Sequence, residues 1–103
     1  MLGEFEYLVV SAAARLGNNA YGAAIKEEIE RTAKRSCSIG ALYTTIDRLE
    51  SKGLIETWMG EATAARGGRA KRMVRVTGKG AREAAASYQT VTRATRGLAW
   101  EVK

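Results

Sequence analysis

A run of basic residues in the second half of the chain carries the clearest chemical signal. Five basic residues and no acidic one lie between Arg66 and Arg75, next to the turn-forming pair Gly67-Gly68. Guanidinium and ammonium groups on such a loop suit contacts with DNA phosphates, and an arginine can enter the minor groove. The alternative is that these charges keep an exposed hairpin from pairing with other strands.

A second stretch, from Ser38 to Gly53, has residues suited to reading DNA. Ser38 is typical of a helix N-cap, and Gly53 of a left-handed C-terminus. The predicted helix has an apolar stripe made by Ile39, Leu42, Ile46 and Leu49, and an opposite face made by Gly40, Ala41, Thr44, Asp47, Arg48 and Ser51. A helix with small outward residues can approach the major groove closely. The alternative is that this face is polar only because it is exposed to solvent, as in most amphipathic helices.

The missing residue types exclude several classes of site. The chain has no histidine, and Cys37 is its only cysteine. Zinc sites of the usual Cys/His kind, Ser-His-Asp or Cys-His catalysis, and an intrachain disulfide are therefore excluded within one chain. Glycine-rich phosphate loops are missing too. We expect no enzymatic activity, no metal and no cofactor.

Size and charge restrict the remaining possibilities. With 103 residues, 46% of them hydrophobic, the chain is expected to form one small domain. Its formal charge of +6 suits nucleic acid, an anionic membrane or an acidic protein. We expect no signal peptide and no membrane span, and the single cysteine fits the cytoplasm. The thiol of Cys37 is either a buried group or an oxidation sensor.

The elements that position these residues follow from periodicity. Helices are predicted at 4–16, 22–32, 38–52 and 78–100, and strands at 54–59 and 71–76. This order predicts a mainly α fold with a small β-hairpin (α+β), namely a winged helix-turn-helix with an additional C-terminal dimerisation helix. The wing spans 62–72. We divide the chain into a DNA-binding domain at 1–77 and the dimerisation helix at 78–103.

Both terminal helices have apolar faces that suggest a partner subunit. The first helix is apolar on two sides, so its second side is covered by a partner or by a tail of its own chain. The last helix has a short heptad seam. The predicted dimer-interface residues are Phe5, Tyr7, Val10, Tyr88, Val91, Thr95 and Leu98. Trp100 is an interface anchor, part of a candidate apolar ligand pocket between subunits, or a surface side chain.

Three motifs, in order along the chain, resemble those of the PadR family of transcriptional regulators. Tyr21-Gly22-Ala23-Ala24-Ile25 resembles the family's Tyr-Gly-x-x-Ile segment. The stretch 40–55 resembles its Gly-x-Leu-Tyr-x-x-Leu-x-Arg-Leu-x-x-x-Gly-Leu-Ile signature. The segment 67–72, followed by Val76-Thr77 and Gly80, resembles its wing. Ile39, Thr44 and Ala70 replace frequent prolines, and the short C-terminal part resembles the short subfamily.

The resemblance implies a homodimer that binds an inverted repeat in a promoter and represses transcription. It places Tyr43 near the DNA backbone and Gly40, Ala41, Thr44 and Arg48 in the groove. The predicted DNA-binding residues are Ser38, Gly40, Ala41, Tyr43, Thr44, Arg48, Arg66, Arg69, Lys71 and Arg72. Some short members bind planar aromatic drugs between subunits, so a small hydrophobic effector is a candidate ligand.

Two other functions remain open at this point. One is a winged-helix protein-interaction module whose basic wing docks an acidic partner. The other is an architectural protein that binds DNA without regard to sequence. Competition with random DNA separates the latter from a specific regulator, whose preference for its own site is at least about a thousandfold.

Overall fold

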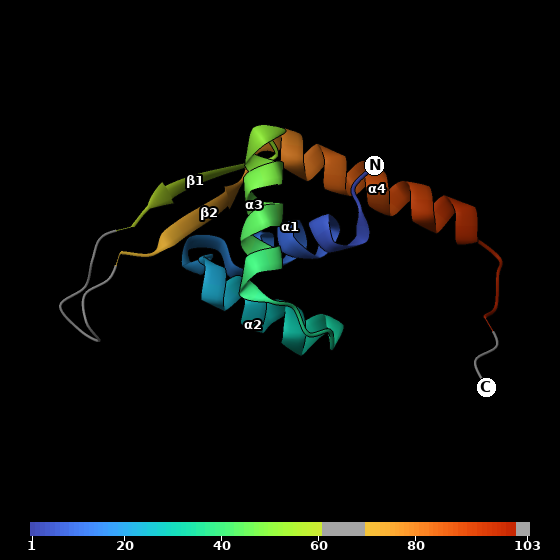
Figure 1. Ribbon diagram of the computed structural model, residues 1–103. Helices are drawn as coiled ribbons and strands as arrows, with labels where there is room; N and C mark the ends of the chain where they lie inside the picture. The colour runs from blue at the N-terminus through green and yellow to red at the C-terminus, as the bar shows by residue number, and fades with distance from the viewer. Residues whose placement is uncertain (61–69, 101–103) are drawn as a thin grey trace.

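The fold is mainly helical and carries one two-stranded antiparallel hairpin, as predicted (Figure 1). The computed structural model describes residues 1–60 and 70–100. Its elements, in chain order, are α1 (Glu4–Leu16), the 3₁₀ turn η1 (Gly17–Asn19), α2 (Gly22–Ala33), α3 (Ile39–Ser51), β1 (Ile55–Met59), β2 (Arg72–Val76) and α4 (Gly78–Thr95). The division into domains at 77/78 stays a prediction, although α4 begins there.

Apolar side chains from α1, α2, α3 and the hairpin form one core, and Ala84 of α4 packs against it. Helices α1 and α2 contribute their inward faces, α3 packs across them, and the hairpin closes one side (Figure 1). The largest fully buried side chains are Val9, Ile25, Ile29, Leu42, Ile46, Leu49, Ile55 and Val74. Burial of each such side chain contributes about 1.5–3 kcal/mol before conformational entropy is subtracted. The core therefore fixes the orientation of α3.

Helix α3 starts and stops where its end residues predict. The Ser38 hydroxyl accepts a hydrogen bond from the Ala41 N–H at 3.1 Å, and Gly53 has φ +75°. The prediction that Ile39 is buried is wrong, because its side chain is 47% exposed. The segment 34–38 before it is irregular and almost wholly exposed, so no element covers the first turn of α3.

The hairpin pairs Ile55 with Val76 at one end and Met59 with Arg72 at the other. Both strands lie within one residue of their predicted limits. The chain ahead of α2 joins the sheet edge, because the Val74 N–H donates to the Ala20 carbonyl at 2.8 Å and Tyr21 forms a bridge with Met73. These bonds bring the start of α2 next to the base of the wing.

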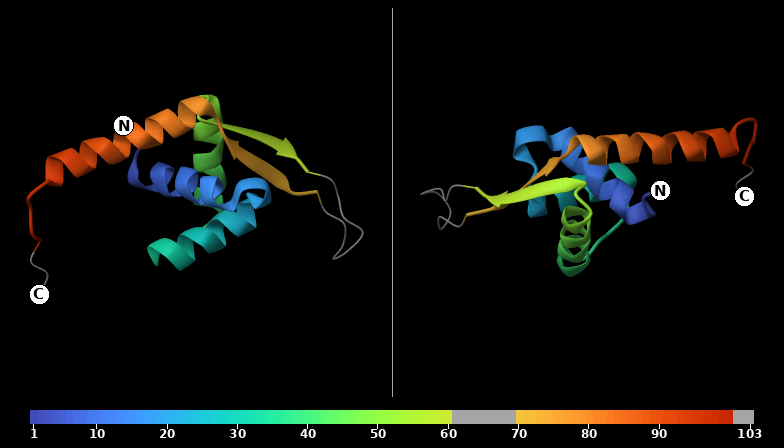
Figure 2. Two further views of the ribbon diagram at one scale, coloured as in Figure 1. Left: turned by 180° about the vertical axis from the view of Figure 1, so that it is seen from behind. Right: turned by 90° about the horizontal axis from the view of Figure 1, so that it is seen from above.

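Helix α4 begins at Gly78, and the hydroxyl of its N-cap residue Thr77 accepts a hydrogen bond from the Gly80 N–H at 3.0 Å. The prediction that it runs to residue 100 is wrong, because it ends at Thr95 and Gly97 turns the chain with φ +81°. A residue with this φ cannot continue a right-handed helix. Seen from behind and from above, α4 and the hairpin extend from opposite sides of the helical body (Figure 2).

Candidate nucleic-acid interface

Helix α3 presents an open face of small and polar residues. Gly40, Ala41, Thr44, Asp47, Arg48 and Ser51 are all exposed. A Cβ atom added to Gly40 would have no neighbouring atom within 4 Å, so nothing in the described chain stands over the start of the helix. The structure thus brings the predicted groove-facing residues together on one accessible surface. Ser38 lies at its edge and uses its hydroxyl as the helix cap.

Tyr43 lies beside this face and is held by the start of α2. Its side chain is half-buried, and a Cβ atom on Gly22 would lie 2.3 Å from its hydroxyl oxygen. The glycine at position 22 therefore permits the ring to lie against the first turn of α2. The phenol is fixed with its hydroxyl near that helix end.

A groove of about 430 Å³ lies at this junction, with Tyr21, Gly22, Tyr43 and Lys71 in its lining. The ammonium of Lys71 lies 4.0 Å from the centre of the Tyr21 ring. No side chain caps the first N–H groups of α2, because its N-cap position is Tyr21. An uncapped helix start, a phenol hydroxyl and an ammonium form an arrangement suited to a phosphate.

Sequence reasoning missed Tyr21 and the first turn of α2 as parts of this surface. The signal was present, because a tyrosine in place of Ser, Thr, Asp or Asn leaves the N-terminal N–H groups without a side-chain acceptor. What the sequence could not show is that Lys71 arrives there. That position depends on the pairing between Tyr21 and Met73.

The predicted wing residues do not share one environment. Arg66 and Arg69 lie outside the described residues. Lys71 is exposed beside the groove. Arg72 instead turns to α3, where it pairs with Asp47 at 2.8 Å and Glu50 at 3.2 Å. Its side chain is only 24% exposed.

Ion pairs also connect α3 to helix α1. The ammonium of Lys52, which follows α3, lies 2.9 Å from a carboxylate oxygen of Glu6. Arg35, ahead of α3, pairs with Glu4. The Lys52 hydrogen bond, with further help from the Gly3 N–H, holds the pKa of the Glu6 carboxyl below its ordinary value despite burial. The segment ahead of α3 and the residue that follows it are therefore both tied to α1.

The predicted dimer-interface residues fall into two groups. Tyr88, Val91 and Leu98 are exposed, whereas Phe5, Tyr7 and Thr95 are half-buried. A groove of about 420 Å³ between α1 and α4 includes Tyr7, Leu8, Tyr88 and Val91 in its lining.

Val10 and Trp100 differ from the rest of that set. Val10 is only 2% exposed and belongs to the core of its own chain, so its side chain has no surface left for a partner. The reason is that α1 is covered on two sides by elements of the same chain, including α2, α3 and α4. Trp100 is 73% exposed beyond the end of α4 and lines neither groove.

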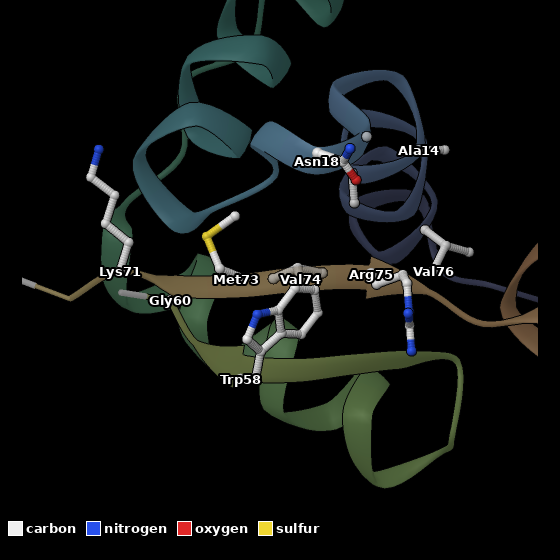
Figure 3. A pocket seen from close by; sticks show the side chains of 11 residues that line it. Ala14, Asn18, Trp58, Gly60, Lys71, Met73, Val74, Arg75 and Val76 are labelled. Atoms are coloured by element: carbon white, nitrogen blue, oxygen red, sulfur yellow. The ribbon is translucent and has the colours of Figure 1, made fainter. Parts of the chain in front are cut away.

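A further cavity, of about 550 Å³, lies between the hairpin and the end of α1 (Figure 3). Trp58 comes from β1, and Asn18 and Ala14 come from η1 and α1 (Figure 3). Arg75 pairs with Glu56, and its guanidinium carbon lies 5.8 Å from the centre of the Trp58 ring. Arg72 and Arg75 are three residues apart on one strand, so their side chains leave opposite faces of the hairpin.

The thiol of Cys37 is half-buried ahead of α3. Burial, with a contribution from Glu30, raises the pKa of this thiol above its ordinary value. A raised pKa disfavours the reactive thiolate. This environment favours the interpretation of Cys37 as an unreactive thiol.

Within residues 1–60 and 70–100, no cluster of three metal-ligating side chains occurs. None of the helices in this described part is both long enough and apolar enough to cross a bilayer.

The sequence profile described as "Transcriptional regulator PadR-like family" matches residues 12–86. A comparison with curated protein sequences found no match.

Several solved structures share the fold. A PadR family transcription regulator from Clostridium difficile R20291 aligns with a TM-score of 0.69 and 24% identity, over 90% of this chain and 95% of that one. A transcriptional regulator from Clostridium thermocellum aligns with a TM-score of 0.71 and 20% identity, over 88% and 85% of the two chains. A PadR-like transcription factor from Bacteroides fragilis aligns with a TM-score of 0.66 and 21% identity, over 92% of this chain and 89% of that one.

Proposed function

The chain belongs to the PadR-like family of transcriptional regulators, and we propose that it is a homodimeric repressor that binds an inverted repeat in promoter DNA. Family membership makes it a DNA-binding regulator. The observation that supports the specific proposal is the continuous surface of α3, the first turn of α2 and Lys71. On this surface an open helix face lies beside a groove suited to a phosphate.

In this proposal the helix 38–52 enters the major groove. Gly40 and Ala41 allow close approach, and the methyl groups of Ala41 and Thr44 contact thymine methyls. Arg48, exposed one turn further on, donates to a base edge or a phosphate. Tyr43 and the first turn of α2 hold the backbone beside the groove.

The wing 62–72 adds contacts to the DNA backbone or the minor groove. Lys71 supplies one phosphate contact from the described part of the wing, and Arg66 and Arg69 supply others. Each phosphate neutralised by a basic side chain steepens the fall of log affinity with log salt concentration by about 0.9. The wing therefore contributes affinity more than sequence preference.

Dimerisation brings two copies of α3 onto one face of the DNA. The exposed residues Tyr88, Val91 and Leu98 and the neighbouring groove beside α1 form the proposed interface. Two recognition helices in a symmetric pair read half-sites about one helical turn apart. The groove is also where a small hydrophobic effector would bind between subunits, although Trp100 is not part of its lining. The regulator would act in the cytoplasm.

Selection of bound duplexes from a random DNA pool, followed by footprinting, tests this function. We expect a two-fold symmetric site that is preferred over random DNA by at least about a thousandfold. The double change Thr44→Ala, Arg48→Ala should reduce that preference. Arg75→Ala is the matched control, because Arg75 pairs with Glu56 within the hairpin and is not one of the proposed DNA-contacting residues, so the preference should stay intact.

Three outcomes would contradict the proposal in whole or in part. Binding without sequence preference would identify an architectural DNA-binding protein. Failure to bind any duplex, together with binding of an acidic peptide through Lys71, would identify a protein-interaction module. A symmetric site that raises transcription of a reporter in cells would replace repression by activation.

A further inference from the structure

Arg72 occupies a position between the hairpin and the recognition helix. One of its terminal nitrogens lies 2.8 Å from Asp47 Oδ1, and the other lies 3.2 Å from Glu50 Oε1. Asp47 and Glu50 are three residues apart on α3, so they are neighbours on its surface. The hydroxyl of Thr57, on β1, donates to the second oxygen of Glu50. One guanidinium thus connects two carboxylates of α3 to the sheet.

The neighbouring basic residue Lys71 has another environment. Its ammonium lies over the Tyr21 ring, beside the groove at the start of α2, and the residue is exposed. Successive residues of an extended chain point in opposite directions. Both residues contribute to the lining of the groove, but the guanidinium of Arg72 pairs with the carboxylates of α3. Lys71 is free to meet a phosphate, whereas Arg72 has both terminal nitrogens engaged by carboxylates.

The position of Asp47 makes the pairing important for DNA. Asp47 follows Thr44 by three residues and Gly40 by seven, so it shares their outward stripe. Its side chain is 66% exposed even in the ion pair. An uncompensated carboxylate there would repel the phosphates on both sides of the groove, and Glu50 would add to this repulsion.

We propose that Arg72 is a positioning residue of the DNA interface, which neutralises Asp47 and Glu50, locks α3 against the hairpin and makes no phosphate contact of its own. This inference rests on the proposed function. It assigns different roles to the two basic residues at the base of the wing. Lys71 binds the DNA backbone, and Arg72 neutralises the carboxylates that would otherwise keep α3 away from the phosphates.

A double-mutant cycle tests the assignment by fluorescence anisotropy with a random-sequence duplex. Arg72→Gln should weaken binding roughly tenfold. The paired change Asp47→Asn, Glu50→Gln should then strengthen binding at least about tenfold more in the Arg72→Gln protein than in the native one. A direct phosphate contact by Arg72 predicts the reverse, namely an equal or larger gain in the native protein, where Arg72 would be released.

Salt dependence provides the second measurement, and Lys71→Gln is the matched control. Loss of a phosphate contact lowers the slope of log affinity against log salt by about 0.9. We expect that decrease for Lys71→Gln and not for Arg72→Gln. Arg72→Lys keeps the charge and should recover part of the affinity. Thermal unfolding of every variant confirms that the compared proteins are folded.

The failures of the two proposals are distinguishable. Additive effects in the cycle, or an equal loss of slope for Arg72→Gln and Lys71→Gln, would overturn the assignment of Arg72 while leaving the DNA-binding function in place. A native protein that binds neither the random duplex nor a selected site would overturn the proposed function and this inference with it.

Discussion

Helices α3 and α4 both begin at a hydroxyl cap, yet they are held by very different surroundings. Helix α3 buries Leu42, Ile46 and Leu49 completely, and ion pairs tie the flanking residues Arg35 and Lys52 to α1. Helix α4 has 18 residues but buries only Gly80 and Ser87, and residues 88–94 are all exposed. A helix exposed on all sides is marginal in water. One chain therefore completes the environment of α3, whereas residues 88–94 of α4 stay exposed in the described part of the chain.

The attachment of α4 is concentrated in its first turns. The Leu2 N–H donates to the Ser87 hydroxyl at 2.9 Å, and Lys79 donates to the carbonyl of Lys52 at 2.9 Å. At Gly80 the backbone of α4 approaches the Leu54 carbonyl closely. This difference fits the proposed roles: a recognition helix needs one fixed position within its subunit, whereas a dimerisation helix needs an anchored first turn and an exposed end.

The largest effect is expected from a charge placed on the free part of α4. Val91→Asp should raise the dimer dissociation constant by roughly a hundredfold, because a buried aspartate at the proposed interface would lack a partner. Sedimentation equilibrium measures this directly. Gln89→Asp is the control, since residue 89 lies on the other side of the helix. Equal dimer strength in Val91→Asp and the native protein would contradict the proposed interface.

The next largest effect is expected from a change in the first turn of α4. In Gly80→Ala the new Cβ atom would lie 2.0 Å from the Leu54 carbonyl oxygen, so α4 must shift against the hairpin. We expect a loss of about 3 kcal/mol in the free energy of unfolding, measured by urea denaturation. Gly78→Ala, in the same turn, meets only the flexible end of Arg82 and is the control. If Gly80→Ala loses less unfolding free energy than Gly78→Ala, α4 is not anchored at Gly80.

A smaller effect is expected from the tie between α1 and the end of α3. Because the Lys52 hydrogen bond lowers the pKa of Glu6 in the folded protein, the ion pair stabilises the fold above the ordinary pKa of the carboxyl, and this stabilisation is lost as pH falls through the folded-state pKa. Glu6→Gln should cost about 1.5 kcal/mol at neutral pH and nothing in strong acid.

Urea denaturation across the acid range measures this difference. Lys52→Gln should show the same pH dependence, and the double variant should lose no more than either single one. A difference between Glu6→Gln and the native protein that persists in strong acid would exclude the ion pair as its cause.

The smallest expected change is at the open end of α3. Gly40→Ala adds a methyl group that meets no described atom within 4 Å. It should stabilise the free protein by up to about 1 kcal/mol, because alanine favours the helix more than glycine. The same methyl group should weaken DNA binding, because it fills the space where α3 would lie closest to the DNA. Stabilised protein with unchanged affinity would place Gly40 outside the contact surface.

The local features of this chain were readable from its sequence. Ser38 and Thr77 cap helices, and Gly53 ends one, because each acts through backbone groups a few residues away. The apolar spacing of Leu42, Ile46 and Leu49 predicted a buried stripe for the same local reason. The order of helices and strands, and the motifs shared with the PadR family, followed from these short-range patterns.

Tertiary structure decided the features that depend on distant segments. Val10 is covered because α1 meets elements on two sides, and Ile39 is exposed because no element reaches it. The roles of Lys71 and Arg72 diverge for the same reason. A basic residue attracts phosphates or carboxylates equally well, so its sequence neighbours do not determine its partner. Pairing of β2 with β1 and with the start of α2 brings Arg72 to the carboxylates of α3 and Lys71 to Tyr21.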